Sequence, residues 1–180
     1  MLRATGAKQN IILTDKHDYI ERRRQSTGIY GEGPGRRADS LADYKGKKVV
    51  LYFYPEDDTP TCTVQACNLR DNYSLLKREG FSVIGVSPND ERSHKKFEVK
   101  FDLPFPLVAD PDRKIIDKYG VWGEKQLYGR KYIGLHRTTF LIDEKGVIRK
   151  IFLKPRSKQH AEEITKAWAS LTAADAKPLK

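Results

Sequence analysis

The sequence predicts a three-layer α/β sandwich, in which a central mixed β-sheet carries helices on both faces. Two unbroken apolar blocks, residues 49–54 and 81–87, are typical of strands that are buried on both sides. The helical pattern between them, residues 61–78, completes a strand–helix–strand unit and therefore predicts a right-handed parallel crossover. Two more apolar runs flank a short turn at residues 144–146, which predicts an antiparallel hairpin that extends the sheet.

The elements between these landmarks follow from local pattern and from glycine. Gly80 ends the first helix. Helical patterns then cover residues 92–101 and 111–119, with a short strand at residues 107–109 between them. Residues 120–134 are rich in glycine and tyrosine, which predicts a loop.

The C-terminal part of the domain reads as a hairpin followed by a helix. The hairpin strands are residues 138–143 and 147–153. The helix carries apolar residues at spacings i, i+3, i+4 and i+7, namely Ile164, Ala167, Trp168 and Leu171. It therefore presents one apolar face to the sheet.

Length and composition indicate one folded domain with flanking segments. The chain has 180 residues, close to the size of a single domain, and its 38% of hydrophobic residues come in blocks that argue against wholesale disorder. We expect the domain to span residues 40–172. The basic segment 1–39 has little structural pattern, and we expect it to be atypical or disordered; residues 173–180 form a C-terminal tail.

The compartment is inferred from what the sequence lacks. No apolar run approaches the ~18 residues of a membrane-spanning helix, and no signal-peptide pattern follows the start. Two cysteines are too few for a disulfide-stapled secreted scaffold. We therefore expect a cytoplasmic protein that does not associate with membranes and keeps both thiols reduced at rest.

The net charge of +10 raises the alternative of a nucleic-acid-binding module. The excess lies at the two ends, with net +5 in residues 1–50 and +6 in residues 145–180, whereas residues 51–144 carry −1. No recognition motif accompanies this charge. We expect no specific nucleic-acid binding, although a basic module on the same scaffold stays open as an alternative.

Cys62 is a candidate nucleophile because of its place in the chain. It follows a buried strand and a polar turn, and it lies at the start of a helix whose first position suits Pro60. Helix N-termini carry partial positive charge and free N–H groups, which favour the thiolate form of a thiol. The carboxyl end of a strand is also where open α/β sheets place active sites. The alternative is a buried structural cysteine.

Cys67 lies five residues beyond Cys62. In an intact helix this offset means about 7.5 Å of rise and about 500° of rotation, so the Cα separation exceeds the ~4.4–6.8 Å that a disulfide accepts. If the two cysteines pair, the first turns of the helix must unwind. The alternative, that Cys67 packs on the inner face, is not decided by spacing.

Two other uses of the cysteines are disfavoured. A zinc site would need a second pair of ligands, and the four histidines, at positions 17, 94, 136 and 160, show no paired spacing. A thioredoxin-type redox pair has two intervening residues, whereas four separate Cys62 from Cys67.

Three segments together carry a longer motif. Residues 52–67 read Tyr-Phe-Tyr-Pro-Glu-Asp-Asp-Thr-Pro-Thr-Cys-Thr-Val-Gln-Ala-Cys, followed by Leu-Arg-Asp at 69–71. Residues 120–125 read Gly-Val-Trp-Gly-Glu-Lys, and 136–143 read His-Arg-Thr-Thr-Phe-Leu-Ile-Asp. This set resembles the peroxiredoxins, in the bacterioferritin comigratory protein or peroxiredoxin Q class. The resemblance runs from about residue 40 to residue 168.

The resemblance implies a thiol peroxidase with a thioredoxin-like fold. Cys62 would be the peroxidatic cysteine, whose thiolate attacks a peroxide and becomes a sulfenic acid. Thr59 would hydrogen-bond the thiolate and the peroxide, and Pro55 would shield the site from water. Arg137 would stabilise the thiolate and the charge on the leaving oxygen.

The resemblance also implies the rest of the catalytic cycle. Cys67 would be the resolving cysteine, which forms an intramolecular disulfide with Cys62. A thioredoxin or glutaredoxin-type reductant would restore both thiols. The substrates would be hydrogen peroxide and organic hydroperoxides, the enzyme would be a monomer, and it would need no metal, haem or flavin cofactor. A redox sensor in which Cys62 oxidises but turns over slowly is a further alternative.

The chain departs from the family pattern in two places. Thr61 stands where glycine is common in this class. Residues 1–39 do not match the segment with which the family usually opens. Neither departure affects the residues to which the resemblance assigns catalytic roles.

Overall fold

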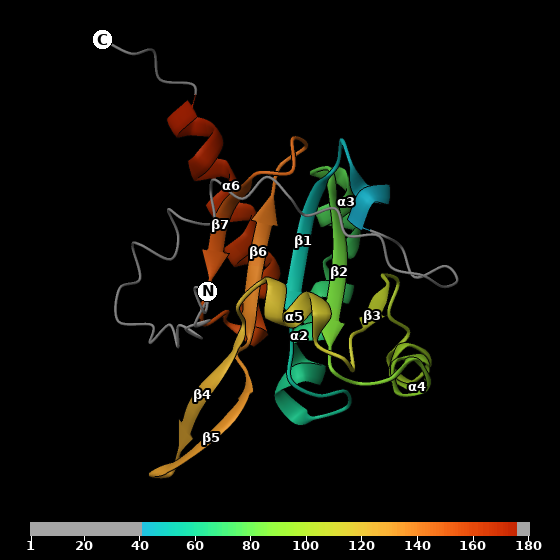
Figure 1. Cartoon of the computed structure of the whole chain (residues 1–180). Coiled ribbons are helices and arrows are strands. Elements are labelled where there is room, and N and C mark those ends of the chain that lie inside the picture. Colours follow the sequence, from blue (N-terminus) through green and yellow to red (C-terminus); the bar gives the residue numbers. More distant parts are fainter. Residues whose placement is uncertain (1–40, 176–180) are drawn as a thin grey trace, which may run out of the picture.

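The computed structural model describes residues 41–175, and its centre is a five-stranded mixed sheet (Figure 1). The strand order is β3-β2-β1-β6-β7. Strands β1, β2 and β3 run parallel, whereas β6 is antiparallel to β1, and β7 to β6. The strands are β1 (Lys48–Phe53), β2 (Phe81–Ser87), β3 (Leu107–Ala109), β6 (Thr138–Ile142) and β7 (Ile148–Phe152). The predicted parallel unit with a hairpin extension is therefore confirmed.

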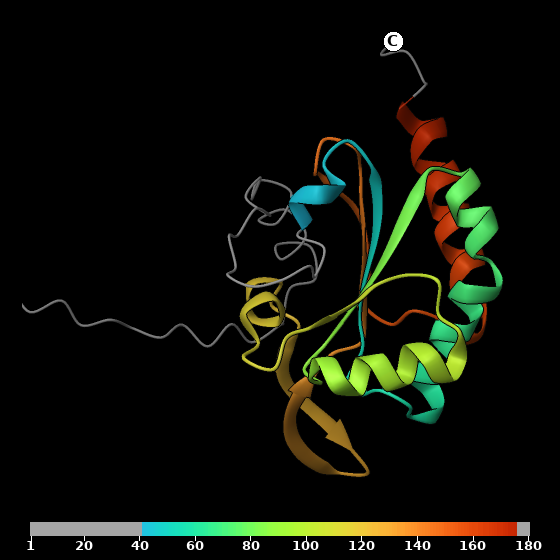
Figure 2. The ribbon, with the colours of Figure 1, turned by 90° about the vertical axis from the view of Figure 1, so that its right-hand side faces the viewer.

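Helices cover both faces of this sheet, which Figure 2 shows edge-on. One face carries α2 (Pro60–Asp71), α3 (Tyr73–Arg78), α4 (Glu91–Phe101) and α6 (His160–Asp175). A short 3-10 helix, η2 (Ser157–Gln159), leads into α6. The other face carries α5 (Lys114–Lys118) and the 3-10 helix η1 (Leu41–Tyr44). This is the predicted three-layer sandwich.

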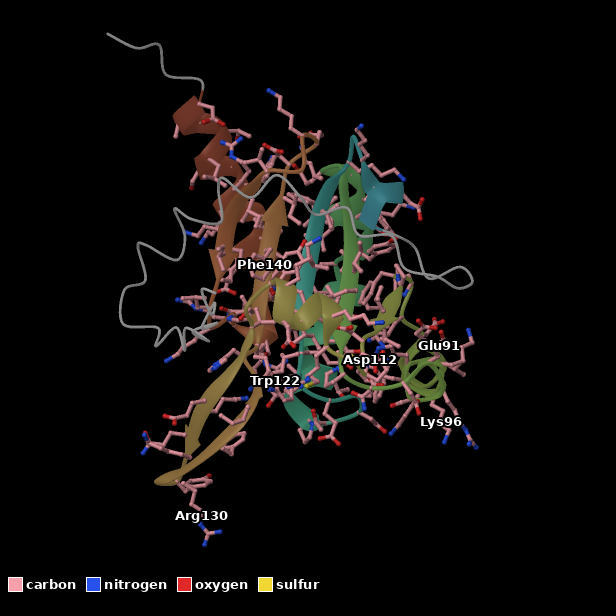
Figure 3. The ribbon with its side chains drawn as sticks, viewed as in Figure 1. Glu91, Lys96, Asp112, Trp122, Arg130 and Phe140 are labelled. Carbon is pink, nitrogen blue, oxygen red and sulfur yellow. The ribbon has the colours of Figure 1, made fainter. Side chains whose placement is uncertain are left out.

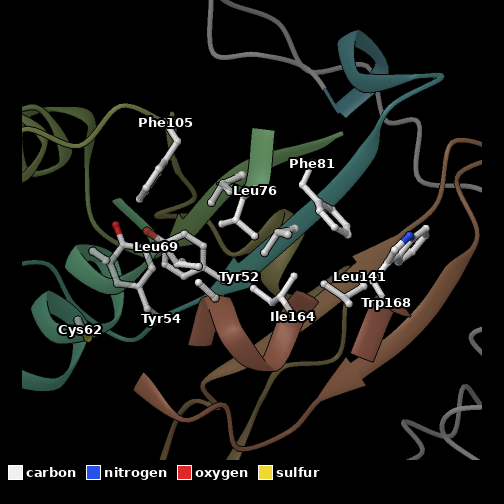
Figure 4. Close-up of a cluster of buried hydrophobic side chains, with 14 of the residues drawn as sticks. Tyr52, Tyr54, Cys62, Leu69, Leu76, Phe81, Phe105, Leu141, Ile164 and Trp168 are labelled. Atoms are coloured by element: carbon white, nitrogen blue, oxygen red, sulfur yellow. The ribbon is translucent and has the colours of Figure 1, made fainter. Parts of the chain in front are cut away.

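Strand β1 is buried on both sides because its alternate side chains enter two separate cores. Val50, Tyr52 and Tyr54 join the core under α2, α3 and α6, called the first core below, part of which is drawn in Figure 4. Val49, Leu51 and Phe53 join the core under α5, with Ile116, Tyr119 and Phe140 among its members. A strand of this kind needs apolar residues at every position, which explains the unbroken apolar run.

The prediction of a loop at residues 120–134 is wrong. The structure has two strands there, β4 (Trp122–Leu127) and β5 (Arg130–Leu135), paired as a separate antiparallel hairpin. The hairpin projects from the body, with Trp122 at its base and Arg130 at its tip (Figure 3). Tyr128 and Gly129 form its turn with φ of 49° and 78°, the left-handed values that two-residue hairpin turns require.

The hairpin was missed because its burial is concentrated at its base, where Leu135 and Trp122 pack in the core under α5. Along most of β5 the side chains are exposed, and Ile133 is 61% accessible. Without a buried face beyond the base there is no alternation of apolar and polar residues for a sequence reading to detect.

Two helix boundaries also differ from the prediction. The single helix expected at residues 61–78 is broken at Asn72, whose φ of −103° and ψ of 11° are not helical. The helix expected at 111–119 begins later, after Arg113 with φ of 58°. The Asp110 carboxylate accepts hydrogen bonds from the amides of Ile115 and Ile116, which anchors the start of α5.

The predicted segment 1–39 lies outside the described residues, and the predicted domain limits of 40 and 172 stay a prediction. Helix α6 runs to Asp175, so it enters the region expected to be a tail. Among residues 41–175, no helix combines the length and apolar character needed to cross a membrane.

Gly85 in β2 tests how tightly the first core is packed. A Cβ there would lie 2.6 Å from Cδ2 of Leu107 and 2.8 Å from Oη of Tyr52. We expect Gly85→Ala to lower the free energy of unfolding by about 1–3 kcal/mol, because those side chains must move in a filled core. Urea denaturation measures the change.

Gly134→Ala is the control for this substitution, since its Cβ would meet nothing nearer than 3.4 Å. We expect its unfolding midpoint to match that of the unaltered chain. An equal midpoint for Gly85→Ala would show that the Tyr52 ring is not held in place.

Candidate active site

Cys62 lies where β1 passes into α2. The strand pairing continues one residue beyond β1, because the Tyr54 amide donates to the carbonyl of Val86 at 3.1 Å. A turn follows, and α2 begins at Pro60 with Thr59 as its N-cap in extended conformation. Cys62 is therefore in the first turn of the helix, only 1% exposed, at the edge of the first core (Figure 4).

Arg137 reaches the same point from a segment 75 residues later in the chain. It directly precedes β6, and β6 pairs with β1 so that Thr138 lies opposite Phe53. The end of β1 and the start of β6 are therefore neighbours. The Arg137 Nη2 donates to the Cys62 sulfur at 3.1 Å. A hydrogen bond from a guanidinium favours the charged thiolate over the neutral thiol.

Gln65 completes this group, although our reading of the sequence did not single it out. It lies three residues after Cys62, which places both side chains on one face of α2. Its Oε1 accepts a hydrogen bond from Arg137 Nη1 at 2.6 Å, and the residue is fully buried. Within the described residues, its Nε2 has no hydrogen-bond partner. Gln65 holds the guanidinium so that its second nitrogen faces the sulfur.

Thr59 and Pro55 lie in the turn before Cys62. The Thr59 hydroxyl donates to the carbonyl of Glu56 at 3.1 Å, so its proton is used within the turn. Its carbonyl accepts from the Thr63 amide at 2.9 Å, the first hydrogen bond of α2. Pro55 is partly buried and directly follows Tyr54.

Cys67 lies farther along α2 and is partly exposed. Both cysteines are free thiols, and the helix is continuous from one to the other. The structure therefore joins Cys62 to Arg137 by a hydrogen bond and keeps Cys67 apart from both.

A buried polar cluster around Asp57 fixes the turn between β1 and α2. Asp57 accepts hydrogen bonds from the Tyr54 hydroxyl at 2.7 Å and the Ser93 hydroxyl at 2.6 Å. His94 Nδ1 lies 2.9 Å from Asp57 Oδ2, and because the carboxylate accepts, this nitrogen carries the proton. Burial by itself raises the pKa of Asp57, but the bonds from His94, Ser93 and Tyr54 outweigh it and hold the pKa below 3.8.

The tyrosines beside this cluster stay neutral. Burial is the main cause that raises the pKa of both Tyr52 and Tyr54 far above the ordinary value of 10.0. Tyr54 is therefore a hydrogen-bond donor to Asp57 rather than a second anion. In the part of the chain that the structure describes, no group of three or more His, Cys, Asp or Glu residues could hold a metal ion.

Comparison with known proteins agrees with this geometry. Residues 35–151 match the model of the AhpC/TSA family. Peroxiredoxin Bcp of Bacillus subtilis is 44% identical over 123 residues, which cover 68% of this chain and 78% of that protein. Peroxiredoxin Bcp of Escherichia coli is 42% identical over 125 residues, covering 69% and 80%.

Solved structures of this class have the same fold. A cysteine-to-serine variant of Xylella fastidiosa PrxQ superposes with a TM-score of 0.69 at 31% identity, covering 74% of this chain and 83% of that one. A Xanthomonas campestris bacterioferritin comigratory protein, studied for alkyl peroxide reduction, gives 0.67 at 31% identity, covering 76% and 85%. The fold is therefore thioredoxin-like, as in these peroxiredoxins.

The Asp57 carboxylate makes stability depend on acid pH. Because its pKa is lower in the folded chain than the ordinary 3.8, its stabilising contribution is complete above about pH 4 and is lost as pH falls below that value. We expect Asp57→Asn to be less stable than the unaltered chain at pH 7 and to lose less stability between pH 5 and pH 3. Urea denaturation across this range measures both.

Asp112→Asn is the matched control, since that carboxylate is 75% exposed in the turn between β3 and α5. We expect its acid profile to follow that of the unaltered chain. A profile for Asp57→Asn parallel to the control would contradict the assignment of this pKa.

Proposed function

The chain belongs to the AhpC/TSA family and is a peroxiredoxin, a thiol-dependent peroxidase, and on this premise we propose that Cys62 is its peroxidatic cysteine. The observation that supports this most directly is the 3.1 Å hydrogen bond from Arg137 to the Cys62 sulfur. Cys67 is also a free thiol on α2, but it is only partly buried. Arg137 donates its hydrogen bond to the Cys62 sulfur and not to that of Cys67.

The first step is a two-electron oxidation of Cys62. Its thiolate attacks the terminal oxygen of the peroxide, so that an S–O bond forms as the O–O bond breaks. Cys62 becomes a sulfenic acid, and the second oxygen takes up a proton and leaves as water or an alcohol. Arg137 stabilises both the thiolate and the negative charge that develops on the leaving oxygen.

Thr59 and Pro55 prepare the approach to the sulfur. The Thr59 hydroxyl proton is donated to Glu56, which leaves the oxygen lone pairs to accept a hydrogen bond from the incoming peroxide. Pro55 removes a backbone N–H from the turn and limits the access of water. These roles are supported by their place in the one turn that leads to Cys62.

Cys67 is proposed as the resolving cysteine. Its sulfur attacks the Cys62 sulfenic acid, an S–S bond forms as the S–O bond breaks, and one water leaves. Helix geometry places Cα atoms five residues apart at about 8.7 Å, beyond the ~6.8 Å limit of a disulfide. Part of α2 must therefore unwind before this step. A thioredoxin or glutaredoxin-type dithiol then reduces the disulfide to two thiols.

Both hydrogen peroxide and organic hydroperoxides are proposed as substrates. Peroxides are the substrates of this family, and the relative from Xanthomonas campestris that reduces alkyl peroxides supports organic hydroperoxides beside hydrogen peroxide. We propose a monomeric cytoplasmic enzyme whose catalytic domain spans residues 40–172, acting without a metal or organic cofactor. A cytoplasmic setting would keep both thiols reduced between turnovers.

The cysteine roles are tested by intact mass after one equivalent of hydrogen peroxide. We expect the reduced chain to lose two hydrogens, Cys62→Ser to stay unchanged, and Cys67→Ser to gain one oxygen, because its sulfenic acid has no internal partner. Cys67→Ser serves as the matched control for Cys62→Ser. If Cys62→Ser still reacts rapidly, Cys62 is not the nucleophile.

Turnover is tested in the same preparation by supplying thioredoxin and its reductase. Sustained consumption of peroxide supports the peroxidase cycle. A single equivalent consumed, with no further turnover, would favour the slow redox sensor instead.

Arg137→Ala should slow the oxidation of Cys62 by about 10²–10³-fold, because the cation that stabilises the transition state is removed. Gln65→Leu should slow it by about tenfold, since the guanidinium loses the acceptor that orients it. Gln65→Glu keeps that acceptor and should react faster than Gln65→Leu. Stopped-flow measurement of peroxide reduction gives these rates.

Arg130→Ala is the control, because Arg130 is exposed at the tip of the hairpin (Figure 3). We expect this variant to react like the unaltered chain. An Arg137→Ala variant that folds normally and matches the Arg130→Ala rate would exclude the proposed role of Arg137.

A further inference from the structure

Two polar anchors flank the part of the chain that carries both cysteines. The first anchor is Asp57 together with its hydrogen-bond partners, which are Asn89 just before α4, and Ser93 and His94 in α4. The second anchor is Asn68 with the backbone groups at the start of α6. Residues 58–67 lie between the two anchors, and they include Cys62 and Cys67.

The first anchor fastens the turn before α2 to α4. Ser93 and His94, both on α4, hydrogen-bond the Asp57 carboxylate at 2.6 and 2.9 Å. The Asp57 amide donates to the side chain of Asn89 at 3.0 Å, just before α4. The Asp57 and His94 side chains are 4% and 3% exposed. Water therefore cannot easily replace these bonds, which makes the anchor costly to break.

The second anchor fastens α2 to α6 directly after Cys67. The Asn68 Nδ2 donates to the carbonyl of Lys158 at 3.0 Å, and its Oδ1 accepts from the Ala161 amide at 2.9 Å. One side chain thus satisfies a free amide at the start of α6 and a carbonyl of η2. The next residue, Leu69, is fully buried in the first core. The helix beyond Cys67 is therefore held by both polar and apolar contacts.

The segment between the anchors has fewer ties to the rest of the fold. Its buried side chains are those of Cys62, Gln65 and Ala66. Its side-chain hydrogen bonds to residues outside the segment run from Arg137 to Cys62 and Gln65, and from the Thr59 hydroxyl to the Glu56 carbonyl. Asp58 also forms an exposed ion pair with Lys100. Exposed ion pairs contribute little to stability. Oxidation of Cys62 replaces the thiolate that accepts the Arg137 bond, so it weakens one of these few ties.

The anchors also leave enough chain for the cysteines to meet. Ten residues span roughly 15 Å as a helix but about 33–36 Å when extended. The segment can therefore unwind and loop back on itself while both ends stay in place. Fixed ends restrict the unwound conformations, which keeps the two sulfurs at a high effective concentration.

We propose that the unwinding of α2 is confined to residues 58–67, and that Asp57 and Asn68 are positioning residues that confine it and thereby speed disulfide formation. The proposal rests on the resolving role proposed for Cys67. In this step, the S–O bond of the Cys62 sulfenic acid breaks and the S–S bond forms. The hydroxyl of the sulfenic acid takes the thiol proton of Cys67 and leaves as water.

Hydrogen exchange of the full chain, in its reduced and disulfide forms, locates the unwound region. Mass analysis of each sample first verifies the loss of two hydrogens. We expect amides within residues 58–67 to exchange at least about tenfold faster in the disulfide form. Peptides from α4, from residues 69–78 and from the start of α6 should keep their reduced-state rates.

Substitution of the second anchor tests the positioning role. In Asn68→Ala we expect faster exchange to spread on oxidation into residues 69–71 and the start of α6. The sulfenic acid should convert to disulfide about three- to tenfold more slowly, the effect of losing one or two buried hydrogen bonds. The oxidation of Cys62 should change by less than about twofold, because the Asn68 side chain hydrogen-bonds to Lys158 and Ala161 and to neither Cys62 nor Arg137. Rapid-quench mass analysis separates the two rates.

Two further variants keep this test decisive. Asn68→Asp retains the acceptor for the Ala161 amide, so we expect its rate of disulfide formation to stay close to that of the unaltered chain. This variant tests the anchor even where Asn68→Ala does not fold. Ser93→Ala removes one bond of the first anchor and should let exchange spread into α4 on oxidation. Asp112→Asn, at the exposed carboxylate between β3 and α5, is the control and should match the unaltered chain.

Three outcomes would overturn the proposal. In the unaltered chain, faster exchange that already reaches α4 or the start of α6 would show that the anchors do not confine the unwinding. Equal slowing of both rates in Asn68→Ala and Asn68→Asp would indicate a general structural role. Absence of the disulfide would instead show that Cys67 is not the resolving cysteine, so the proposed function fails at that step and this inference with it.

Discussion

The pairing of β1 with β2 on one side and β6 on the other is the constraint on which the site depends. Parallel pairing with β2 directs the chain after Tyr54 into a helix above the carboxyl edge of the sheet. Antiparallel pairing with β6 brings Arg137 to that same edge from a distant part of the chain. A register shift of one residue would turn every side chain of β6 to the opposite face. The backbone hydrogen bonds of the sheet therefore fix the position of the Arg137 guanidinium relative to the Cys62 sulfur.

Helix α2 meets two demands that conflict. Its first turn holds Cys62 against Arg137 and aligns Gln65 on the same face, and this arrangement requires an intact helix. The same intact helix keeps Cys67 too far away for a disulfide. An enzyme that uses both thiols must alternate between a folded helix and an unwound one. The proposed anchors at Asp57 and Asn68 would let it do so while the two cores stay packed.

The Asp57 carboxylate beside the turn is buried but meets several hydrogen-bond donors, and this explains how it coexists with an aromatic core. Among the described residues, the Tyr52 hydroxyl and the Nε2 atoms of Gln65 and His94 have no hydrogen-bond partner. Tyr52 and Tyr54 stack with ring centroids 5.3 Å apart, and Tyr54 also donates to Asp57. Asp57 in turn accepts from α4, so that its charge is met by donors from several directions. A buried carboxylate without these donors would destabilise the fold. The network thus links the aromatic packing of β1 to the position of the turn that leads to Cys62.

Short-range pattern was enough to predict the parallel unit, the C-terminal hairpin of the sheet, the last helix and Cys62 as a candidate nucleophile. The resemblance to the peroxiredoxins added the candidate roles of Cys67, Thr59, Pro55 and Arg137. Apolar runs and turn residues act over a few positions, and the cysteine motif is contiguous, so both can be read along the chain. Gln65, the Asp57–His94 pair and the anchor at Asn68 depend instead on partners 37 to 93 residues away, and the tertiary structure alone shows them. The hairpin β4–β5 was missed for a different reason: beyond its base at Trp122 and Leu135 it is largely exposed, so its strands show no alternation of apolar and polar residues.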